Sequence, residues 1–261
     1  MVHDYLAVAR PGAGMKLSII GSSDAFGSGG RLQTCFHVAH ANGAFLIDCG
    51  ATALIGLERQ GIDPNSISTI FVSHLHGDHF AGLIWWMIHA VHVAKREAPL
   101  TVVGPAGIQE RYVTATEALF PGTSACNRPF HLVFRTYEDF VPLSEGGVTV
   151  KPFVVSHPSG ATSYGLRFDV DGKTLAFSGD TEWVEGLVPL SEGADLFICE
   201  CFAYEREARF HLNWRTIEAN LPRISAKRIM LTHLGSEALA NQASMRHERV
   251  SIAQDGLALD I

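Results

Sequence analysis

Short apolar runs alternate along the chain with stretches of helical spacing, and most of the runs end in Gly, Ser, Asp or His. Runs of this kind, bounded by turn residues, are typical of strands that are buried on at least one face. Two pairs of runs are joined by Asn42 and Gly43 and by Asp171 and Gly172, turn dipeptides that favour β-hairpins. The pattern predicts strands over 17–21, 34–39, 44–48, 69–73, 100–103, 148–155, 164–170, 174–178, 196–202 and, as the last clear strand, 228–232.

Helical spacing and capping residues predict helices between these strands. A helix over 51–60 is closed by Gly61, and a helix over 214–221 has Asn213 as its N-cap. A long buried helix is expected after residue 79 and extends to about residue 97, because Pro99 then stops it. A further helix is expected over 106–118. Two β-rich halves with helices between their strands predict an α/β fold in which helices flank two packed sheets.

The composition predicts a single folded domain. The chain has 261 residues, of which 47% are hydrophobic and 18% are charged, so it can bury a full core without disulfide bonds. No low-complexity linker divides it, and we expect one domain over 15–261. Residues 1–14 have an early acidic residue and no apolar core, which is typical of a loose extension rather than of a signal peptide.

Charge, cysteine content and hydropathy bear on location and partners. The formal net charge of -7 argues against a bulk nucleic-acid binder, which needs a basic surface. The five cysteines include no CxxC pair and are expected to be free thiols, as in a reducing cytoplasm. No apolar run has the length of a membrane span. We therefore expect a cytoplasmic protein, with a homodimer as the base-rate expectation for its assembly.

The strongest chemical signal is the segment His74-Leu75-His76-Gly77-Asp78-His79, which directly follows a predicted buried strand. Strand geometry points the first two histidines to the same side, and Gly77 permits a tight turn that brings Asp78 and His79 close to them. Imidazole nitrogens and a carboxylate at this spacing suit zinc or a similar borderline cation. The segment therefore predicts a metal site at the end of the strand.

This segment resembles the HxHxDH signature of the metallo-β-lactamase superfamily, and three later positions are similar to the further ligands of that family in order and context. They are His157 after a mid-chain strand, Asp180 in a strand–Gly–Asp turn, and His233 at the end of a late strand. The resemblance implies an αββα four-layer sandwich, with two mixed sheets flanked by helices and two metal ions at one edge. It implies one metal held by His74, His76 and His157, a second held by Asp78, His79 and His233, and Asp180 as the bridge between them.

The resemblance implies a dinuclear metal-dependent hydrolase. Two divalent cations about 3.5–4 Å apart can share a hydroxide and stabilise the charge that develops on a substrate oxygen. Zinc lowers the pKa of a bound water to about 7, so the nucleophile exists at neutral pH. Zinc is the default expectation from the ligand types, with manganese or iron as alternatives for a mixed His and Asp site.

Departures from the family pattern narrow the expected activity. Asp180 stands where the best-known antibiotic-hydrolysing members use Cys, and His76 stands where the flavodiiron oxygen reductases use Glu. Glu200 in ICECFAYE and His211 in RFHLNW instead resemble the branch that contains tRNase Z and related phosphodiesterases. That resemblance implies that His211 stands over the metals and protonates the leaving oxygen or stabilises charge on the phosphate. The alternative for His211 is a surface histidine ahead of a helix.

A small phosphodiester is the substrate that these observations favour. The family's tRNA-processing members carry a long Gly- and Pro-rich arm, and the loop at 120–130 is too short to be one. We therefore expect a small-molecule phosphodiester as the partner, not a membrane, and nucleic acid is not favoured. The expected catalytic residues are His211, Glu200 and Asp78. Two alternatives stay open, an acyl hydrolase that acts on a lactone, ester or thioester at the same metals, and a non-hydrolytic metal-binding protein.

Overall fold

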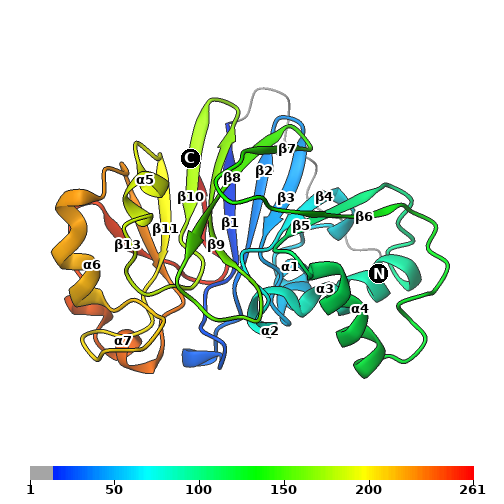
Figure 1. Ribbon diagram of the computed structural model, residues 1–261, viewed down its shortest axis with the longest axis horizontal. Coiled ribbons are helices and arrows are strands. Elements are labelled where there is room, and N and C mark those ends of the chain that lie inside the picture. The colour runs from blue at the N-terminus through cyan, green and yellow to red at the C-terminus, as the bar shows by residue number, and fades with distance from the viewer. Residues whose placement is uncertain (1–13) are drawn as a thin grey trace.

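The structure, a computed structural model, describes residues 14–261. The loose extension predicted at 1–14 therefore lies outside the described residues, apart from Gly14. Two seven-stranded sheets pack face to face, and helices cover the outer face of each sheet (Figure 1). These four layers confirm the αββα sandwich with two mixed sheets.

The first sheet combines an antiparallel half with a parallel half. Its strands, in spatial order, are β14 (Ala258–Asp260), β1 (Lys16–Gly21), β2 (Cys35–His40), β3 (Gly43–Ile47), β4 (Ile67–Phe71), β5 (Leu100–Gly104) and β6 (Leu132–Thr136). Pairing is antiparallel from β14 to β3 and parallel from β3 to β6. The turn at Asn42 and Gly43 joins β2 to β3, as the sequence predicts.

The second sheet has the same plan. Its strands, in spatial order, are β13 (Val250–Ile252), β12 (Ile229–Thr232), β11 (Leu196–Glu200), β10 (Lys173–Phe177), β9 (Ser163–Val170), β8 (Val148–Val155) and β7 (Leu143–Glu145). Pairing is antiparallel from β7 to β10 and parallel from β10 to β13. The parallel strands of both sheets send their carboxyl ends to one edge of the sandwich, where loops can meet.

The helices divide between the two outer faces. The first sheet carries α1 (Ala53–Arg59), α2 (Gly77–Phe80), α3 (Gly82–His92) and α4 (Ile108–Leu119), and the second carries α5 (Leu187–Ser191), α6 (Trp214–Asn220) and α7 (Ser236–Ala240). Short 3₁₀ turns are η1 (Ser28–Gly30), η2 (Pro64–Ser66), η3 (Leu221–Arg223) and η4 (Gln242–Ser244). Within 14–261, no helix has the length and apolar character needed to cross a lipid bilayer.

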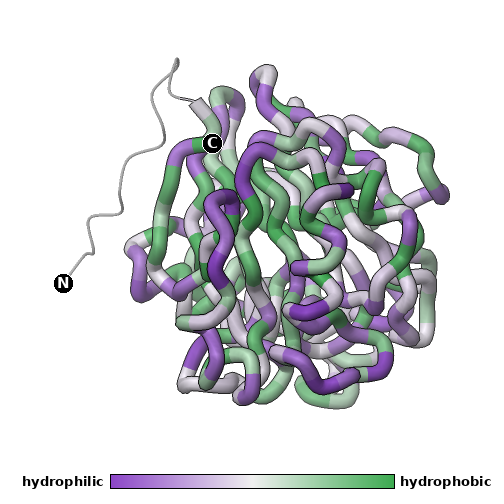
Figure 2. Tube along the Cα trace, turned by 90° about the vertical axis from the view of Figure 1, so that its left-hand side faces the viewer, coloured by the Kyte–Doolittle hydropathy of each residue, from purple (hydrophilic) through white to green (hydrophobic). Residues whose placement is uncertain are grey.

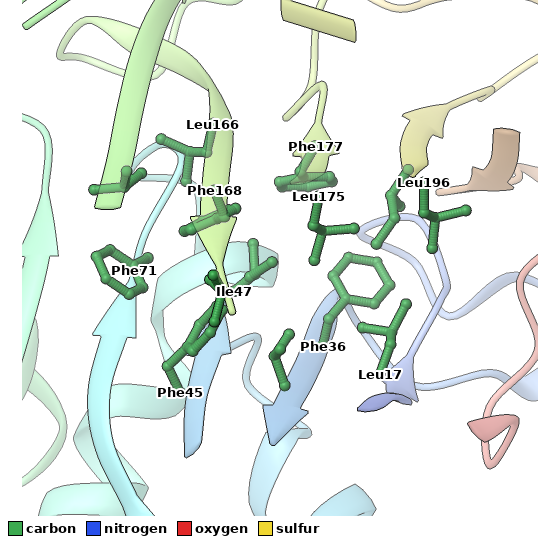
Figure 3. Close-up of a cluster of buried hydrophobic side chains, with 14 of the residues drawn as sticks. Leu17, Phe36, Phe45, Ile47, Phe71, Leu166, Phe168, Leu175, Phe177 and Leu196 are labelled. Carbon is green, nitrogen blue, oxygen red and sulfur yellow. The ribbon is translucent and has the colours of Figure 1, made fainter. Parts of the chain in front are cut away.

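Aromatic side chains fill the space between the sheets. Phe36, Phe45 and Phe71 point from the first sheet toward Phe168 and Phe177 of the second (Figure 3). The ring centroids of Phe36 and Phe177 lie 5.5 Å apart, and those of Phe71 and Phe168 lie 5.2 Å apart. Hydrophobic segments run through the centre of the molecule and polar segments through the surrounding loops (Figure 2). This rigid double layer is the frame that holds the loops at its edge.

The predicted helix after residue 79 is wrong in its length. It is split into α2 and α3, and α3 ends at His92 rather than near residue 97. The chain turns there because Lys95 has a φ of 49° and the N–H of Arg96 donates back to the Ala90 carbonyl. The buried guanidinium of Arg96 then donates to the carbonyls of Ile67 and Pro99. The hydrophobic pattern of the sequence does not reveal that Arg96 is buried and bonds to backbone carbonyls, so the early end of α3 was not predicted.

Two three-residue strands, β13 and β14, follow 228–232, which the sequence predicts as the last clear strand. These strands, like β6 and β7, are short and lie at or next to the edges of their sheets, where alternation is weak. The other predicted strands are present with bounds shifted by a few residues. The five cysteines are free, as expected.

Candidate metal centre

The predicted ligands lie on loops that leave the carboxyl ends of strands in both sheets. The HLHGDH segment follows β4, His157 follows β8, Asp180 follows β10, and His233 follows β12. The helix α2, which begins within the HLHGDH segment, lies at the lower edge of the sandwich in Figure 1. The two sheets therefore bring distant parts of the sequence together at one edge.

The side chains of the described residues form four overlapping groups of candidate ligands. Two of them include His211, namely His157 with Asp180 and His211, and Glu200 with His211 and His233. The other two match the sequence prediction. Of these two, the first group is His74, His76 and His157, and the second is Asp78, His79, Asp180 and His233. Within each group, one candidate ligand atom per residue lies within 4.8 Å of the others. These two groups contain the ligands that the sequence predicts, with Asp180 as the predicted bridge between them, and their role as metal ligands stays a prediction.

The carboxylate of Asp180 lies between the two groups. Its Oδ1 is 3.3 Å from Nε2 of His79, and its Oδ2 is 3.3 Å from Nε2 of His233. The same Oδ2 is 3.8 Å from Nε2 of His74 and 3.9 Å from Nε2 of His157 in the first group. This is the position that a bridging carboxylate requires.

Local backbone geometry places two of these side chains. Gly179 has a φ of 59°, and a Cβ atom there would lie 2.5 Å from the Tyr164 carbonyl oxygen, so only glycine fits the turn that delivers Asp180. His233 also has a positive φ, 58°, which costs free energy in a residue with a side chain. The bond from the His233 N–H to the Ser22 carbonyl holds that conformation.

The donor atoms fit a cation. Nε2 of His74, Nε2 of His79 and Oδ1 of Asp180 are buried and have no hydrogen-bond partner among the described residues. Buried polar atoms without partners cost free energy, which coordination of a cation would recover. Nε2 of His157 and Nδ1 of His76 also face each other at 2.9 Å. Imidazole nitrogens and carboxylate oxygens are the ligands that borderline divalent cations accept.

Asp48 holds the ligands from behind, and sequence reasoning missed it. Its Oδ2 lies 2.6 Å from Nδ1 of His79, and its carboxylate accepts hydrogen bonds from the N–H and the hydroxyl of Ser73. The Ser73 hydroxyl also lies 3.1 Å from Nδ1 of His74. Such contacts fix the ring orientation and leave Nε2 of both histidines directed into the centre. The available signal was a carboxylate at the end of a buried strand, Asp48 after β3, next to the strand that carries the motif.

The charges of the centre shift its histidines in opposite directions. Burial lowers the pKa of His79, but the carboxylates of Asp180, Asp78 and Asp48 outweigh burial and hold this pKa well above its ordinary value. Burial and the nearby charge of His79 lower the pKa of His74 well below its ordinary value. A neutral His74 presents a lone pair for coordination, as a metal ligand must.

Glu200 and His211 also meet, as the sequence predicts. Nδ1 of His211 lies 3.1 Å from Oε1 of Glu200, which is fully buried at the end of β11 and also accepts the N–H of Thr181. The ring of His211 stacks 5.5 Å from that of His233 and lies 4.8 Å from that of His157. Burial lowers the pKa of His211, but its hydrogen bond with Glu200 prevails and raises the pKa to about 9. His211 therefore lies beside both ligand groups, paired with a buried carboxylate, and is not an isolated surface histidine.

The fold and the cluster define a metallo-β-lactamase fold protein of the tRNase Z-like branch. The family model "Anti-Pycsar protein Apyc1" matches residues 15–257, and the chain belongs to that family. The chain is 31% identical to the uncharacterized protein ML1173 of Mycobacterium leprae over 196 aligned residues. The aligned region covers 72% of this chain and 66% of ML1173. The chain is 26% identical over 298 residues to ribonuclease Z of Methanothermobacter thermautotrophicus, covering 95% and 97% of the two chains. The metallo-β-lactamase fold protein YhfI from Bacillus subtilis superposes with a TM-score of 0.77 at 22% identity, over 95% of this chain and 99% of that one.

The contact between Asp48 and His79 predicts a loss of metal affinity in Asp48→Asn. The amide keeps the shape but removes the charge that orients His79, and substitution of such a partner typically weakens binding about 10- to 100-fold. Competition with a chromogenic chelator measures the affinity. Asp63→Asn is the matched control, because the Asp63 side chain caps η2 through the N–H of Asn65 and belongs to neither ligand group. Equal affinities for Asp48→Asn and the control would contradict the role given to Asp48.

Proposed function

We propose that the protein is a metal-dependent phosphodiesterase that acts on a small phosphodiester. The observation that carries the proposal is the pair of His211 and Glu200 beside the two ligand groups. A cationic imidazole in this position suits an anionic substrate and a leaving oxygen that needs a proton. The relative named ribonuclease Z supports phosphodiester chemistry, and the match to one family model over 15–257 supports a single domain.

The two ligand groups would hold two divalent cations, with zinc as our proposal for both and manganese or iron as alternatives. Such cations supply a nucleophile at neutral pH and stabilise charge on the phosphoryl oxygens. Asp180 would hold the two groups at a fixed separation, since its two oxygens face both of them. Asp78 and His233 would bind the same cation, since Oδ2 of Asp78 and Nε2 of His233 lie 3.3 Å apart.

His211 would act as the general acid. A carboxylate at Nδ1 keeps a proton on that nitrogen, so Nε2 is the atom that can deliver a proton to the leaving oxygen. Glu200 would stabilise the cationic imidazole before that transfer and would orient the ring throughout. Burial raises the pKa of Glu200, and the hydrogen bond with His211 opposes that rise. The contact between the two side chains would therefore favour a carboxylate on Glu200 and a proton on His211.

The charge of the chain favours a small substrate over a long polyanion. The net charge is -7, and binding of a nucleic-acid backbone needs an excess of basic contacts. Carboxylates of Glu182 and Glu207 line the cleft next to His211, which disfavours a chain of phosphates there. A single phosphodiester group that reaches the two ligand groups meets no such repulsion along its length.

Hydrolysis of bis(p-nitrophenyl) phosphate by protein loaded with zinc or manganese tests the proposal. We expect turnover that falls at least about 100-fold in Asp180→Ala, because removal of one charged group from such a centre costs several kcal/mol of transition-state stabilisation. Asp169→Ala is the control, since Asp169 is exposed and bonds only Thr174 among its side-chain partners. A panel of cyclic mononucleotides, a precursor tRNA, a lactone and a thioester then ranks the substrates. Turnover of the lactone or thioester far above that of every phosphodiester would contradict the proposal.

The role of His211 predicts a loss of rate without a loss of metal. In His211→Gln we expect kcat for a phosphodiester with a poor leaving group to fall about 100-fold or more, as for other general acids. Metal analysis of the same preparation should match the wild type, because the sequence assigns His211 to neither ligand group. A loss of metal would instead place His211 among the ligands, since its ring also lies in two further groups of candidate ligands. His131→Gln is the control on an exposed surface. Unchanged turnover in His211→Gln would remove this residue from the mechanism.

A further inference from the structure

A loop at 22–32, between β1 and β2, lies against the segment that carries His233. It is the blue loop at the lower edge of the sandwich in Figure 1, and it meets α7. The loop contains η1 and none of the predicted metal ligands. Its contacts with His233 and Leu234 nevertheless make it part of the surroundings of the second ligand group.

The loop holds the backbone of His233 on both sides. The carbonyl oxygen of Ser22 accepts the N–H of His233 at 3.0 Å and the hydroxyl of Thr232 at 3.4 Å. The guanidinium of Arg31 donates to the carbonyl oxygen of Leu234, the next residue, at 2.7 Å. Because His233 has a φ of 58°, its backbone costs free energy that other contacts must offset. The bonds from the loop therefore stabilise the conformation that directs this ligand into the centre.

Asp255 holds the two ends of this loop. Its Oδ1 accepts the N–H of Ser22 at 2.9 Å and the Ser22 hydroxyl at 2.7 Å, and its Oδ2 accepts the N–H of Leu32 at 2.7 Å. Asp24, by comparison, holds the tip of the loop through the N–H of Ser28. Hydrogen bonds to a carboxylate are stronger than those between neutral groups. Three of them at one side chain therefore fix the loop where it leaves β1 and where it returns toward β2.

The position of Asp255 is set outside the loop that it holds. The residue lies between β13 and β14, and the segment around it pairs with β1. The N–H of Gly256 donates to the carbonyl oxygen of Ile19 at 2.9 Å, and the N–H of Ile19 donates to the carbonyl oxygen of Leu257 at 2.8 Å. The carboxylate is thus fixed against the first sheet, while the ligand that it supports follows a strand of the second.

The contacts of Asp255 require a carboxylate. Three donors meet it, and both of its oxygens can accept. An amide would keep one accepting oxygen and would direct its NH₂ group at the donors of Ser22 or Leu32. Burial also lowers the pKa of Arg31, and the charge of Asp255 opposes that shift. Asp255 therefore supports both contacts of the loop with the His233 segment, the one from Ser22 by hydrogen bonds and the one from Arg31 by its charge.

We propose that Asp255 is a positioning residue for the second ligand group, acting on His233 through Ser22 and Arg31. The inference rests on the proposed function only in taking His233 as a metal ligand. It gives the C-terminal segment at 253–257 control over the affinity for the second cation, although Asp255 belongs to neither ligand group. The first group follows β4 and β8, and its affinity is expected to be independent of Asp255.

Amide hydrogen exchange in the metal-free protein tests the inference without any cation. In Asp255→Asn we expect the His233 N–H to exchange about 10- to 100-fold faster, as for loss of a hydrogen-bonded charged group. The amides of β10 and β11, inside the second sheet, should keep their wild-type rates. Ser22→Ala removes one of the three bonds and should give a smaller rise, which also covers the case that Asp255→Asn does not fold. Asp260→Asn is the matched control, because Asp260 is exposed and its backbone carbonyl, not its carboxylate, accepts Arg228.

Zinc affinity in two backgrounds then connects the contact to the second cation. His157→Gln removes a ligand of the first group, and His233→Gln removes a ligand of the second. In the His157→Gln background, Asp255→Asn should weaken zinc binding about 10- to 100-fold, the range for loss of a group that orients a ligand. In the His233→Gln background, the same substitution should leave zinc affinity unchanged within about twofold.

Three results would overturn the inference. The first is a wild-type exchange rate of the His233 N–H in both Asp255→Asn and Ser22→Ala. The second is equal acceleration of this amide and of those in β10 and β11, which would mean that Asp255 stabilises the fold as a whole. The third is an equal loss of zinc affinity in the two backgrounds. If the wild type binds no zinc, the proposed function fails, and hydrogen exchange then decides by itself whether Asp255 positions His233.

Discussion

The candidate metal centre is built around one buried carboxylate that lies among imidazoles. Asp180 lies within 4.0 Å of a ring nitrogen of five histidines, namely His74, His79, His157, His211 and His233. A buried charge is tolerated only where opposite charges or a metal compensate it. These histidines lie on segments that follow strands of both sheets, so the two sheets must keep one relative position for the cluster to exist. The aromatic core between the sheets supplies that position, since Phe36 contacts Phe177 and Phe71 contacts Phe168 across it.

The architecture explains why the site lies at one edge and opens on one side. Each sheet has a parallel half, and parallel strands end together, so their loops converge. Asp48 and Ser73 hold the histidines from the first sheet, whereas Glu200 holds His211 from the second. Both sheets contribute buried groups to the centre, His74 and His79 after the first sheet and Asp180 and His233 after the second.

The sequence predicted the parts of this arrangement that are local or that end a clear strand. HLHGDH is contiguous, and His157, Asp180 and His233 each follow an apolar run, so the structure brings them together as expected. The role of Asp48 was not predicted, because it depends on a contact with His79 between two neighbouring strand ends. The spacing of residues in the sequence does not reveal such a contact. The early end of α3 was not predicted, because it depends on the tertiary hydrogen bonds of the Arg96 guanidinium with the carbonyls of Ile67 and Pro99. Such tertiary contacts override local signals, which explains why the strand ends were predictable and the contacts behind them were not.

The number of metal ions bound per chain tests the central claim most directly. The protein is equilibrated with zinc in excess over the chain, at a low free concentration that a chelating buffer holds constant. Elemental analysis should then give about two ions per wild-type chain, as in other two-metal hydrolases. His157→Gln should keep the second group and lose one ion, and His233→Gln should keep the first group and lose the other. One ion in the wild type, or two ions in both variants, would contradict the account of a centre built from two groups joined by Asp180.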